Sequence, residues 1–547
     1  MADTSTQGQP EAVAGEPLNA SALDASATTG WRAVPARLAR TVRVHWQFSL
    51  FLLAAVLLRI VIILGYPPIM WFPDSFNYFQ DAVTRIPDEV RPNGYPFFLS
   101  LLLPLHNMYP VALLQAAMGV TMGILTYALL RRRGLPWWGG TLAAVPVLFD
   151  VFEMQLEHMV TADILFTFLV TVAVVIACWN DRPSITAMIF VGLLIGYATF
   201  TRTVGTPLLV VILVCMLLRR VGWRRFLAVT VAGIVPIAGY MIWFNGTYGK
   251  YALTESGGAF LYSRVSTFVD CSKLDMPADL KPLCDQRPPD ERWPSQEYLW
   301  ANWEMAPYQW QKTPLMNLYG SDNAYRFTPE ASGLMEKFAK HVILAEPVAY
   351  ARVVRNDFFH TFGWTRQPDP NNWVGNGTEF RFTNTPAQTV WWACGPVDLK
   401  IGCPKATTGD SQAAVLNKQL LNWLGPSAGQ ATAVRPWAGF IQWYQSFMYF
   451  RGTLLAAALL IGLGGVLARW RKLGGISLLP WLTGLALILI PPMTAGFSYR
   501  YVVAAVPVTC LAAGLAFARR PGGKFFRTWV TDDLARYFGR SVPVNEE

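Results

Sequence analysis

The first residue of this sequence that could carry chemistry is a carboxylate in an aromatic setting. Asp74 lies in the stretch WFPDSFNY at 71–78, directly after the first long hydrophobic segment. An ionisable group at a membrane edge is costly to desolvate and marks a candidate functional site. Desolvation raises the pKa of a carboxylic acid, and a carboxylate set against a hydroxyl is a general base. We expect Asp74 to be a catalytic base; the simpler reading is a cap for a short helix at 75–84.

Two arginines occupy positions that the distribution of basic residues in membrane proteins disfavours. Arg202 and Arg500 each lie at the end of an apolar run, on the side expected to be poor in Lys and Arg. A guanidinium grips a phosphate or pyrophosphate through two parallel hydrogen bonds. We expect both to bind the phosphate of a lipid-linked donor, with Arg264 as a third candidate. The alternative is an arginine that snorkels to a headgroup or pairs with an acid.

Acidic residues and a histidine form a corner between two hydrophobic segments. Glu153 and Glu157 share a face if this turn is helical, His158 follows, and Asp163 lies further along, at the start of the next segment. Such oxygen and nitrogen ligands suit a divalent cation, Mg²⁺ or Mn²⁺, or could orient an acceptor. The other reading is a solvated loop. The sequence makes no cofactor certain.

Hydrophobic runs predict the elements that carry these residues. The chain is 53% hydrophobic and only 15% charged, whereas soluble domains carry about 25% charged residues. A spanning helix needs about 20 mostly apolar residues, and 95–105 is too short, so we expect it at the interface. We predict an all-α polytopic membrane protein with ten transmembrane segments: 47–66, 109–130, 136–152, 159–178, 184–201, 203–218, 226–244, 447–468, 474–492 and 501–518.

The placement of charge predicts the orientation. A net charge of +10 does not indicate nucleic-acid binding here, because the basic residues cluster between hydrophobic runs, as in cytoplasmic loops. With ten spans these clusters share one side. We therefore predict a multi-pass protein of the plasma (inner) membrane, with both termini cytoplasmic and the candidate residues extracytoplasmic. The clusters are Arg131–Arg133, Arg219–Arg220, Arg224–Arg225, Arg469–Lys472 and Arg519–Arg520.

The same pattern divides the chain into parts. The first tail is rich in small polar residues that cannot bury a core. The long region between the seventh and eighth segments contains no run that could span, and we expect helices in it at 331–344 and 347–362. The parts are a disordered cytoplasmic tail at 1–44, a transmembrane module at 45–244 with an outer loop at 67–108, an extracytoplasmic α-rich and loop-rich domain at 245–446, C-terminal transmembrane helices at 447–518 and a cytoplasmic tail at 519–547.

Four of the seven cysteines lie in the extracytoplasmic domain. Cys271 with Cys284, and Cys394 with Cys403, are close pairs in an oxidising compartment, so we expect two disulfides. Four free thiols are the other reading. No Cys-x-x-Cys spacing supports a zinc site.

In their order along the chain, these motifs resemble the GT-C glycosyltransferase superfamily. The resemblance is to the phospholipid-carrier-dependent branch with protein O-mannosyltransferases and the lipid A aminoarabinose transferase, and it covers about 45–250 and 447–518. It is carried by Pro73-Asp74-Ser75 with Tyr78, the 91–96 element with Asn93 and Gly94-Tyr95-Pro96, the 157–168 corner, Thr201-Arg202, Tyr499-Arg500-Tyr501 and Pro507.

The resemblance implies inverting transfer of a sugar from a polyprenyl-monophosphate donor to an envelope glycan, lipid or protein hydroxyl. Asp74 would deprotonate the acceptor, and Arg202 and Arg500 would stabilise the departing phosphate. Many protein O-mannosyltransferases carry Asp-Glu where this chain has Asp74-Ser75, which puts a protein acceptor in doubt. The acceptor, sugar or metal site would draw on Tyr78, Asn93, Tyr95, Glu153, Glu157, His158, Asp163 and Tyr499.

Three other functions fit the same residues. A transporter or flippase of a lipid-linked glycan would use the arginines without a base, although no inverted repeat is visible. A glycan polymerase or ligase would bind a pyrophosphate-linked donor. A non-catalytic envelope scaffold would need none of these side chains. The identity of the sugar and of the acceptor stays open.

Overall fold

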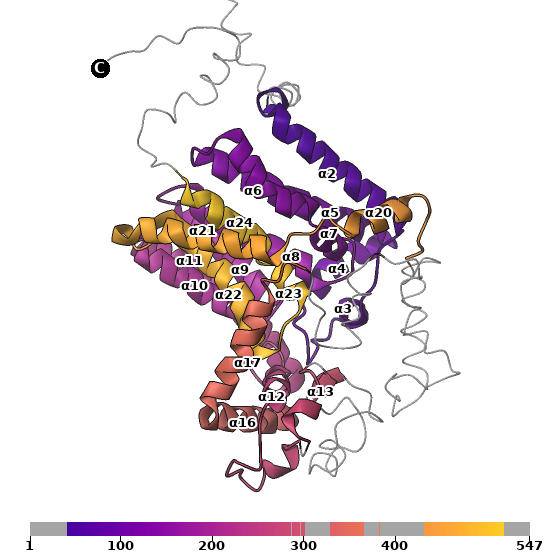
Figure 1. Ribbon diagram of the computed structural model, residues 1–547, viewed down its shortest axis with the longest axis vertical. Helices are drawn as coiled ribbons and strands as arrows, with labels where there is room; N and C mark the ends of the chain where they lie inside the picture. Colours follow the sequence, from indigo (N-terminus) through magenta and orange to yellow (C-terminus); the bar gives the residue numbers. More distant parts are fainter. Residues whose placement is uncertain are drawn as a thin grey trace, which may run out of the picture. The chain divides into compact units, whose positions relative to one another are not determined.

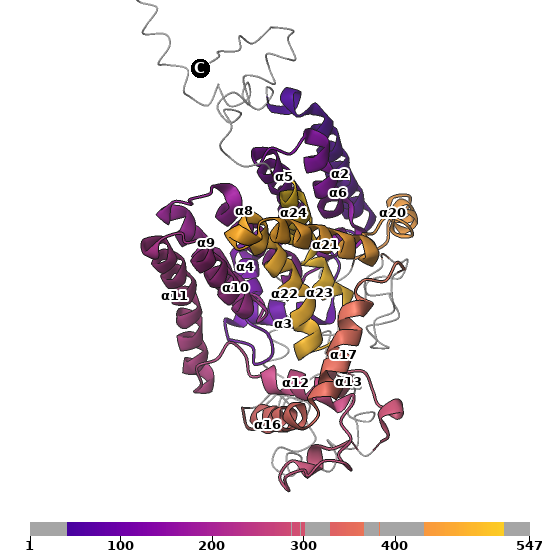
Figure 2. The same ribbon diagram turned by 60° about the vertical axis from the view of Figure 1, so that its left-hand side comes forward.

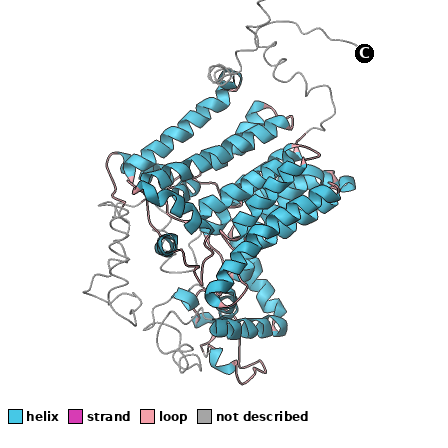
Figure 3. Ribbon diagram, turned by 180° about the vertical axis from the view of Figure 1, so that it is seen from behind, coloured by secondary structure: helices cyan, strands magenta, loops and turns pink. Residues whose placement is uncertain are grey.

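The structure, a computed structural model, describes residues 41–285, 287–295, 297–300, 329–365, 382 and 431–518. The chain divides into two compact units, Met1–Leu50 with Gly522–Glu547, and Phe51–Pro521. Only residues 41–50 of the first unit are described, and the account below concerns the second. Over the described residues the secondary structure is helical, apart from one isolated bridge that joins Met70 to Met159 (Figure 3).

Each of the ten predicted hydrophobic segments contains a helix. Six stretches are long and apolar enough to cross a membrane: 46–65, 109–132, 162–179, 223–248, 475–494 and 499–516. The last two of these stretches each join a short helical turn to α22 or α24. The other four segments contain α6, α9, α10 and α21, which have 13 to 17 residues, fewer than the roughly 20 of a straight crossing. Ten crossings therefore stay a prediction. The helices are α2 (Trp46–Gly65), α5 (Tyr109–Arg132), α6 (Trp137–Phe149), α8 (Ala162–Trp179), α9 (Ile185–Thr199), α10 (Gly205–Leu218), α11 (Trp223–Tyr248), α21 (Gly452–Ala468), α22 (Leu478–Thr494) and α24 (Val506–Ala516).

Helices from the two ends of the sequence share one core. α24 packs against α5, α6 and α8, and α22 packs against α10; Figure 1 shows these orange and yellow helices among the purple and magenta ones. Small residues permit the close approach of α21 and α24, because a Cβ on Gly465 would lie 2.6 Å from Ala516. The C-terminal helices are therefore part of the bundle, and they bring Arg500 back to the N-terminal elements.

A smaller group of helices has its own core. It contains α12 (Gly257–Ser266), α13 (Glu297–Trp300) and α16 (Pro329–Ala345), and α17 (Pro347–His360) extends from it to the bundle core, against which Phe358 packs. We call these four helices the α12–α17 module. Figure 2 shows α12, α13 and α16 grouped together, with α17 running from them to the bundle. Tyr262, Leu283 and Phe338 are buried in this second core. The helices expected at 331–344 and 347–362 are confirmed.

One expected disulfide is confirmed. Cys271 and Cys284 are bonded, with their Cα atoms 6.1 Å apart. The expected Cys394–Cys403 bond lies outside the described residues.

Short elements around residue 74 position the candidate residues. They are α3 (Pro73–Thr84), α4 (Gly94–Leu102), the 3₁₀ turn η1 (Leu103–Leu105), α7 (Val151–Glu157) and α23 (Tyr499–Val503). The expectation that Asp74 caps α3 is wrong. Phe72 is the N-cap, and its N–H donates to Ser75 Oγ at 2.8 Å. Ser75 Oγ in turn donates to the Val160 carbonyl at 2.6 Å, so the start of α3 is tied to the turn before α8 and the Asp74 carboxylate is left for other partners.

A close approach joins the 91–96 loop to the Arg202 turn. A Cβ on Gly94 would lie 2.4 Å from Thr201 Oγ1, so glycine is required there. Gly94 N also donates to the Phe200 carbonyl at 2.6 Å. The two sequence motifs that carry Arg91 and Arg202 are thereby packed together.

Candidate functional site

Five charged side chains from distant parts of the chain form one series of ion pairs, in which no side chain is more than 18% exposed. Arg91 Nη2 lies 2.6 Å from Asp74 Oδ1, and Arg500 Nη1 lies 2.6 Å from Asp74 Oδ2. Arg500 Nε lies 2.6 Å from Asp163 Oδ2, and Arg202 pairs with Asp163 Oδ1. We call this series the five-residue network. It brings together Asp74, Asp163, Arg202 and Arg500 as a group.

Helix ends and aromatic rings hold these charges in place. Asp74 lies in the first turn of α3 and Asp163 in the first turn of α8, where free backbone N–H groups and the helix dipole favour a negative charge. The Arg500 guanidinium lies 4.6 Å from the centre of the Phe72 ring, and that of Arg202 lies 5.0 Å from the centre of the Tyr501 ring. Such contacts stabilise a cation on an aromatic face.

The network changes the expected behaviour of Asp74. Burial acts to raise the pKa of Asp74, but the charges of Arg91 and Arg500 outweigh it and hold the pKa well below its usual range. The expected raised pKa is therefore wrong for this arrangement, because both carboxylate oxygens face guanidinium groups. Asp74 is ionised here, and it is a weak base for as long as both arginines stay on it.

The network carries more positive than negative charge. It contains three arginines and two aspartates. Asp88 lies near Arg91, and burial raises the pKa of Asp88 although the charge of Arg91 acts to lower it. Burial and the neighbouring Arg500 lower the pKa of Arg202, as expected where cations are crowded. An anion such as a phosphate, which guanidinium groups bind through parallel hydrogen bonds, would relieve this crowding.

The acidic corner forms a second charge cluster with a different character. This corner is helical (α7), which is the condition for Glu153 and Glu157 to share a face. Glu157 accepts two hydrogen bonds from Arg59, from Nε to Oε2 and from Nη2 to Oε1, both at 2.6 Å. We call this the closed pair. Both side chains are at most 5% exposed, so the reading as a solvated loop is wrong.

The corner does not fit a divalent cation in this arrangement. Glu157 is used by Arg59, Asp163 by two arginines, and His158 Nε2 lies 2.7 Å from the Tyr66 carbonyl oxygen. Burial lowers the pKa of His158 to about 4. Burial, with the charges of Glu157 and Asp150, raises the pKa of Glu153 well above its usual range, and neither Glu153 carboxyl oxygen has a hydrogen-bond partner among the described residues. Nowhere in the described part do three or more His, Cys, Asp or Glu side chains gather as for a metal.

The remaining candidates fall into two groups. Tyr78 is buried beside the network, packed edge-on against Tyr95 at 5.2 Å between ring centres. The Tyr95 hydroxyl donates to Gln115 Oε1 at 2.6 Å, and Asn93 hydrogen-bonds to backbone groups of its own loop. Tyr499 stacks on an α7 ring. Tyr78 therefore adjoins the charges, whereas Tyr95 and Asn93 bind neighbouring side-chain and backbone groups.

Arg264 does not join the network. Its Nη2 lies 2.9 Å from Asp357 Oδ2 of α17. Burial lowers the pKa of Arg264. Arg264 therefore pairs with Asp357, which also binds the turn before Arg500, and not with the aspartates of the network.

Sequence reasoning missed Arg91 and Arg59. Arg91 opens the 91–96 motif, and the rule that singled out Arg202 and Arg500 applies to it equally, since all three were expected on the side poor in basic residues. Arg59 is a charge inside the first hydrophobic segment, a position that calls for a buried partner. Both signals were present in the sequence, but neither names the partner.

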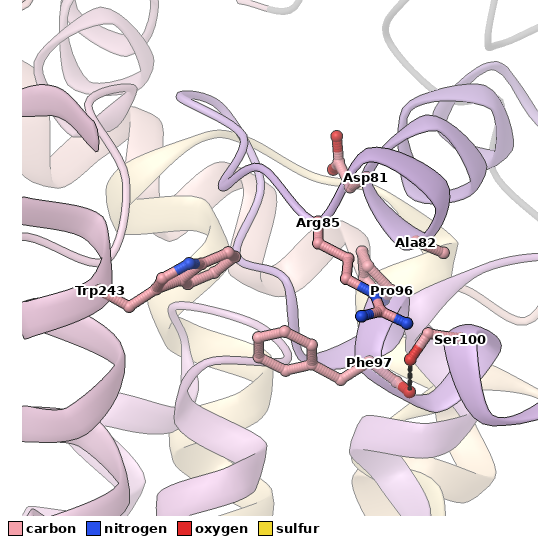
Figure 4. Close-up of a pocket in the computed structure, with 7 residues that line it drawn as sticks. All are labelled: Asp81, Ala82, Arg85, Pro96, Phe97, Ser100 and Trp243. Carbon is pink, nitrogen blue, oxygen red and sulfur yellow. Dashed lines mark hydrogen bonds between the residues drawn. The ribbon is translucent and has the colours of Figure 1, made fainter. Parts of the chain in front are cut away.

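A hollow of about 370 Å³ lies two helical turns along α3 from Asp74. In Figure 4 the guanidinium of Arg85 lies near Ser100, with Phe97 between it and Trp243. Asp81 Oδ2 is buried with no hydrogen-bond partner among the described residues, and burial raises the pKa of Asp81 well above its usual range. None of the lining residues belongs to the network: Asp81, Ala82, Arg85, Pro96, Phe97, Ser100 and Trp243.

Comparison with known proteins gives little. No protein-family model matches the chain, and no curated protein sequence matches it. A similar solved structure is the S. cerevisiae protein O-mannosyltransferase Pmt1–Pmt2 complex bound to the sugar donor, at 17% identity and a TM-score of 0.31. The match covers 42% of this chain and 37% of that chain. At this level it assigns no role to any residue here.

Proposed function

We propose that this chain is a membrane glycosyltransferase that moves a sugar from a polyprenyl-monophosphate donor to a hydroxyl of an envelope acceptor, with inversion, at the outer face of the membrane. One observation carries the proposal: three arginines surround two aspartates in a largely buried cluster at the ends of apolar helices. A phosphate that bears a lipid chain matches both the charge of this cluster and its place beside the bundle.

In the proposed reaction, the aspartate Asp74 accepts a proton and the arginines bind phosphate. The acceptor oxygen forms a bond to the anomeric carbon, and the bond from that carbon to the phosphate oxygen breaks. Asp74 accepts the acceptor proton, and the electron pair of the broken bond stays on the polyprenyl phosphate. Arg500 and Arg202 bind this phosphate, whose negative charge grows as the bond breaks.

The low pKa of Asp74 gives the reaction an order. A carboxylate held by two arginines is a poor base, but a donor phosphate competes with Asp74 for Arg500. Once Arg500 turns to the phosphate, the pKa of Asp74 rises toward that of a carboxylate with one partner. Donor binding would therefore create the base, and a site without donor would not activate an acceptor hydroxyl.

The test uses a panel of radiolabelled polyprenyl-phosphate sugars and membranes that contain wild type or Asp74→Asn. We expect transfer by wild type, and a loss of about 100-fold or more in the variant, within the range of a general base. Donor binding by Asp74→Asn, measured separately, should persist.

The other outcomes separate the competing functions. Equal transfer by both proteins would remove Asp74 from the mechanism. Binding of donor without transfer by wild type would favour a transporter or flippase. Transfer only from pyrophosphate-linked donors would favour a polymerase or ligase.

A further inference from the structure

The turn that carries Arg500 is held by side chains of the α12–α17 module. This turn, residues 493–498, links α22 to α23, and we call it the Arg500 turn. The last carbonyl groups of a helix have no partner within the helix. Here the Tyr350 hydroxyl donates to the Met493 carbonyl at 2.8 Å, and Ser295 Oγ donates to the Ala495 carbonyl at 2.6 Å.

A third contact to the Arg500 turn comes from a charged side chain, Asp357. The Phe497 N–H donates to Asp357 Oδ2 at 3.1 Å, and the same oxygen pairs with Arg264 at 2.9 Å. The Arg264 side chain is only 4% exposed, so Asp357 is the counter-charge of a buried guanidinium and a backbone acceptor at once. The orientation of Phe497 is thereby tied to an ion pair between α12 and α17.

The backbone of the turn is shaped to receive these groups. Gly496 has φ +134°, which side chains rarely adopt, and a Cβ there would lie 2.6 Å from Ser295 Oγ. The His360 ring packs edge-on against Phe497 at 4.6 Å. Side chains of α17 and of the loop before α13 therefore converge on this turn, and Arg500 follows two residues later.

We propose that Arg264, Ser295, Tyr350 and Asp357 form a clamp that sets the position of Arg500 in the five-residue network. They are positioning residues, and they give the α12–α17 module control over phosphate binding by a helix of the bundle. The inference rests on the proposed function for its effect on transfer. Its effects on backbone motion and on phosphate binding are independent of transfer.

The experiment compares Asp357→Ala with Asp270→Ala in the purified full chain. Asp270 forms an exposed ion pair with Lys273 in the same module, away from the Arg500 turn, so it is a matched control. Hydrogen–deuterium exchange over 493–501 and binding of undecaprenyl monophosphate in nanodiscs are the readouts. We expect faster exchange and about tenfold weaker binding in Asp357→Ala only, since small misplacements of a binding group have large effects.

A second set of variants distinguishes positioning from general destabilisation. Asp357→Asn keeps the acceptor for the Phe497 N–H, so it should recover part of the binding. Ser295→Ala and Tyr350→Phe each remove one hydrogen bond to the Arg500 turn. Each should weaken phosphate binding by a few-fold and keep a melting temperature near that of wild type. These two variants test the clamp even if Asp357→Ala does not fold. If transfer is detected, the donor KM should rise more than kcat falls.

The outcomes separate this inference from the proposed function. Unchanged exchange and unchanged phosphate binding in Asp357→Ala, Ser295→Ala and Tyr350→Phe would overturn the clamp. Faster exchange with unchanged binding would also overturn it, because Arg500 would then be positioned without these residues. Clamp effects on binding in a protein that transfers no sugar would keep the clamp and reject the transferase.

Discussion

The five-residue network and the closed pair place buried arginines and carboxylates in the same molecule with opposite results. In the closed pair, one arginine meets one glutamate through two hydrogen bonds, and the charges cancel. In the network, two carboxylates each face two arginines, and one positive charge is left over. A balanced, fully bonded pair has nothing to offer a ligand, whereas an unbalanced series can exchange an internal partner for an external anion.

The comparison also separates the two clusters by their place in the fold. Arg59 lies within α2 and Glu157 at the end of α7, so their pair staples two bundle elements. The network residues lie instead at helix ends and turns, where backbone can adjust and a ligand can approach. Stability and binding should therefore respond separately to changes in the two clusters.

The largest expected effect is at Arg500. Arg500→Met removes the one side chain that touches both aspartates, and we expect transfer to fall by about 1,000-fold, the upper range for loss of one group that stabilises developing charge. Arg500→Lys should lower transfer almost as much, because a single ammonium group cannot bind both aspartates as the guanidinium nitrogens do. The assay is transfer from labelled donor; near wild-type activity of the lysine variant would show that contact with both aspartates is not needed.

Next in size is the effect of opening the closed pair. Arg59→Met leaves Glu157 buried without its partner, and removing one member of a buried pair costs about 3–5 kcal/mol of stability. The double variant Arg59→Met/Glu157→Met should melt closer to wild type. Thermal melting in detergent measures both, and binding of undecaprenyl monophosphate to the folded fraction should not change. Lost binding in the double variant would mean that the two clusters are coupled.

A smaller effect tests the fit of the same pair. A Cβ on Gly119 of α5 would lie 1.8 Å from Glu157 Oε1, whereas Gly239 of α11 has no such neighbour within 4 Å. Gly119→Ala should lower stability by about 1–3 kcal/mol, as for overpacking elsewhere, and Gly239→Ala should not. Equal melting temperatures for the two variants would contradict the described packing of Glu157.

The smallest expected effect has the opposite sign. Asp74→Asn removes one negative charge from the network and frees Arg500, so undecaprenyl monophosphate should bind about tenfold more tightly, in line with one nearby charge in a partly screened site. Glu157→Gln is the control and should leave the affinity unchanged. Weaker binding by Asp74→Asn would mean that Asp74 positions Arg500 and does not compete with the ligand.

Apolar runs in the sequence were enough to locate the helices, and the placement of charges was enough to locate part of the site. The apolar runs predicted the bundle helices, and the expected helix at 331–344 corresponds to α16. Charges in unfavourable places pointed to Asp74, Arg202 and Arg500, which do meet. Such placement identifies residues that need partners, because a buried charge is costly wherever it lies.

The pairing itself could not be predicted. Whether Glu157 binds a cation or Arg59 depends on how α2 and α7 pack, and the sequence contains no local trace of that packing. The pKa of Asp74 was predicted to rise because burial was visible in the sequence and the two arginines on its oxygens were not. Arg264 was expected at the phosphate because its carboxylate partner was likewise not visible in the sequence. In the structure it pairs with Asp357.

The sequence separation within the network bears on how the protein is made. Asp74 and Arg500 are 426 residues apart, and Asp163 and Arg500 are 337 apart. During synthesis, Asp74 and Asp163 must wait until nearly all of the bundle has been made before Arg500 joins them. Until then each carboxylate has a single arginine, and the charges balance. The excess positive charge of the network therefore arises only when the C-terminal helices have been made and packed against the bundle.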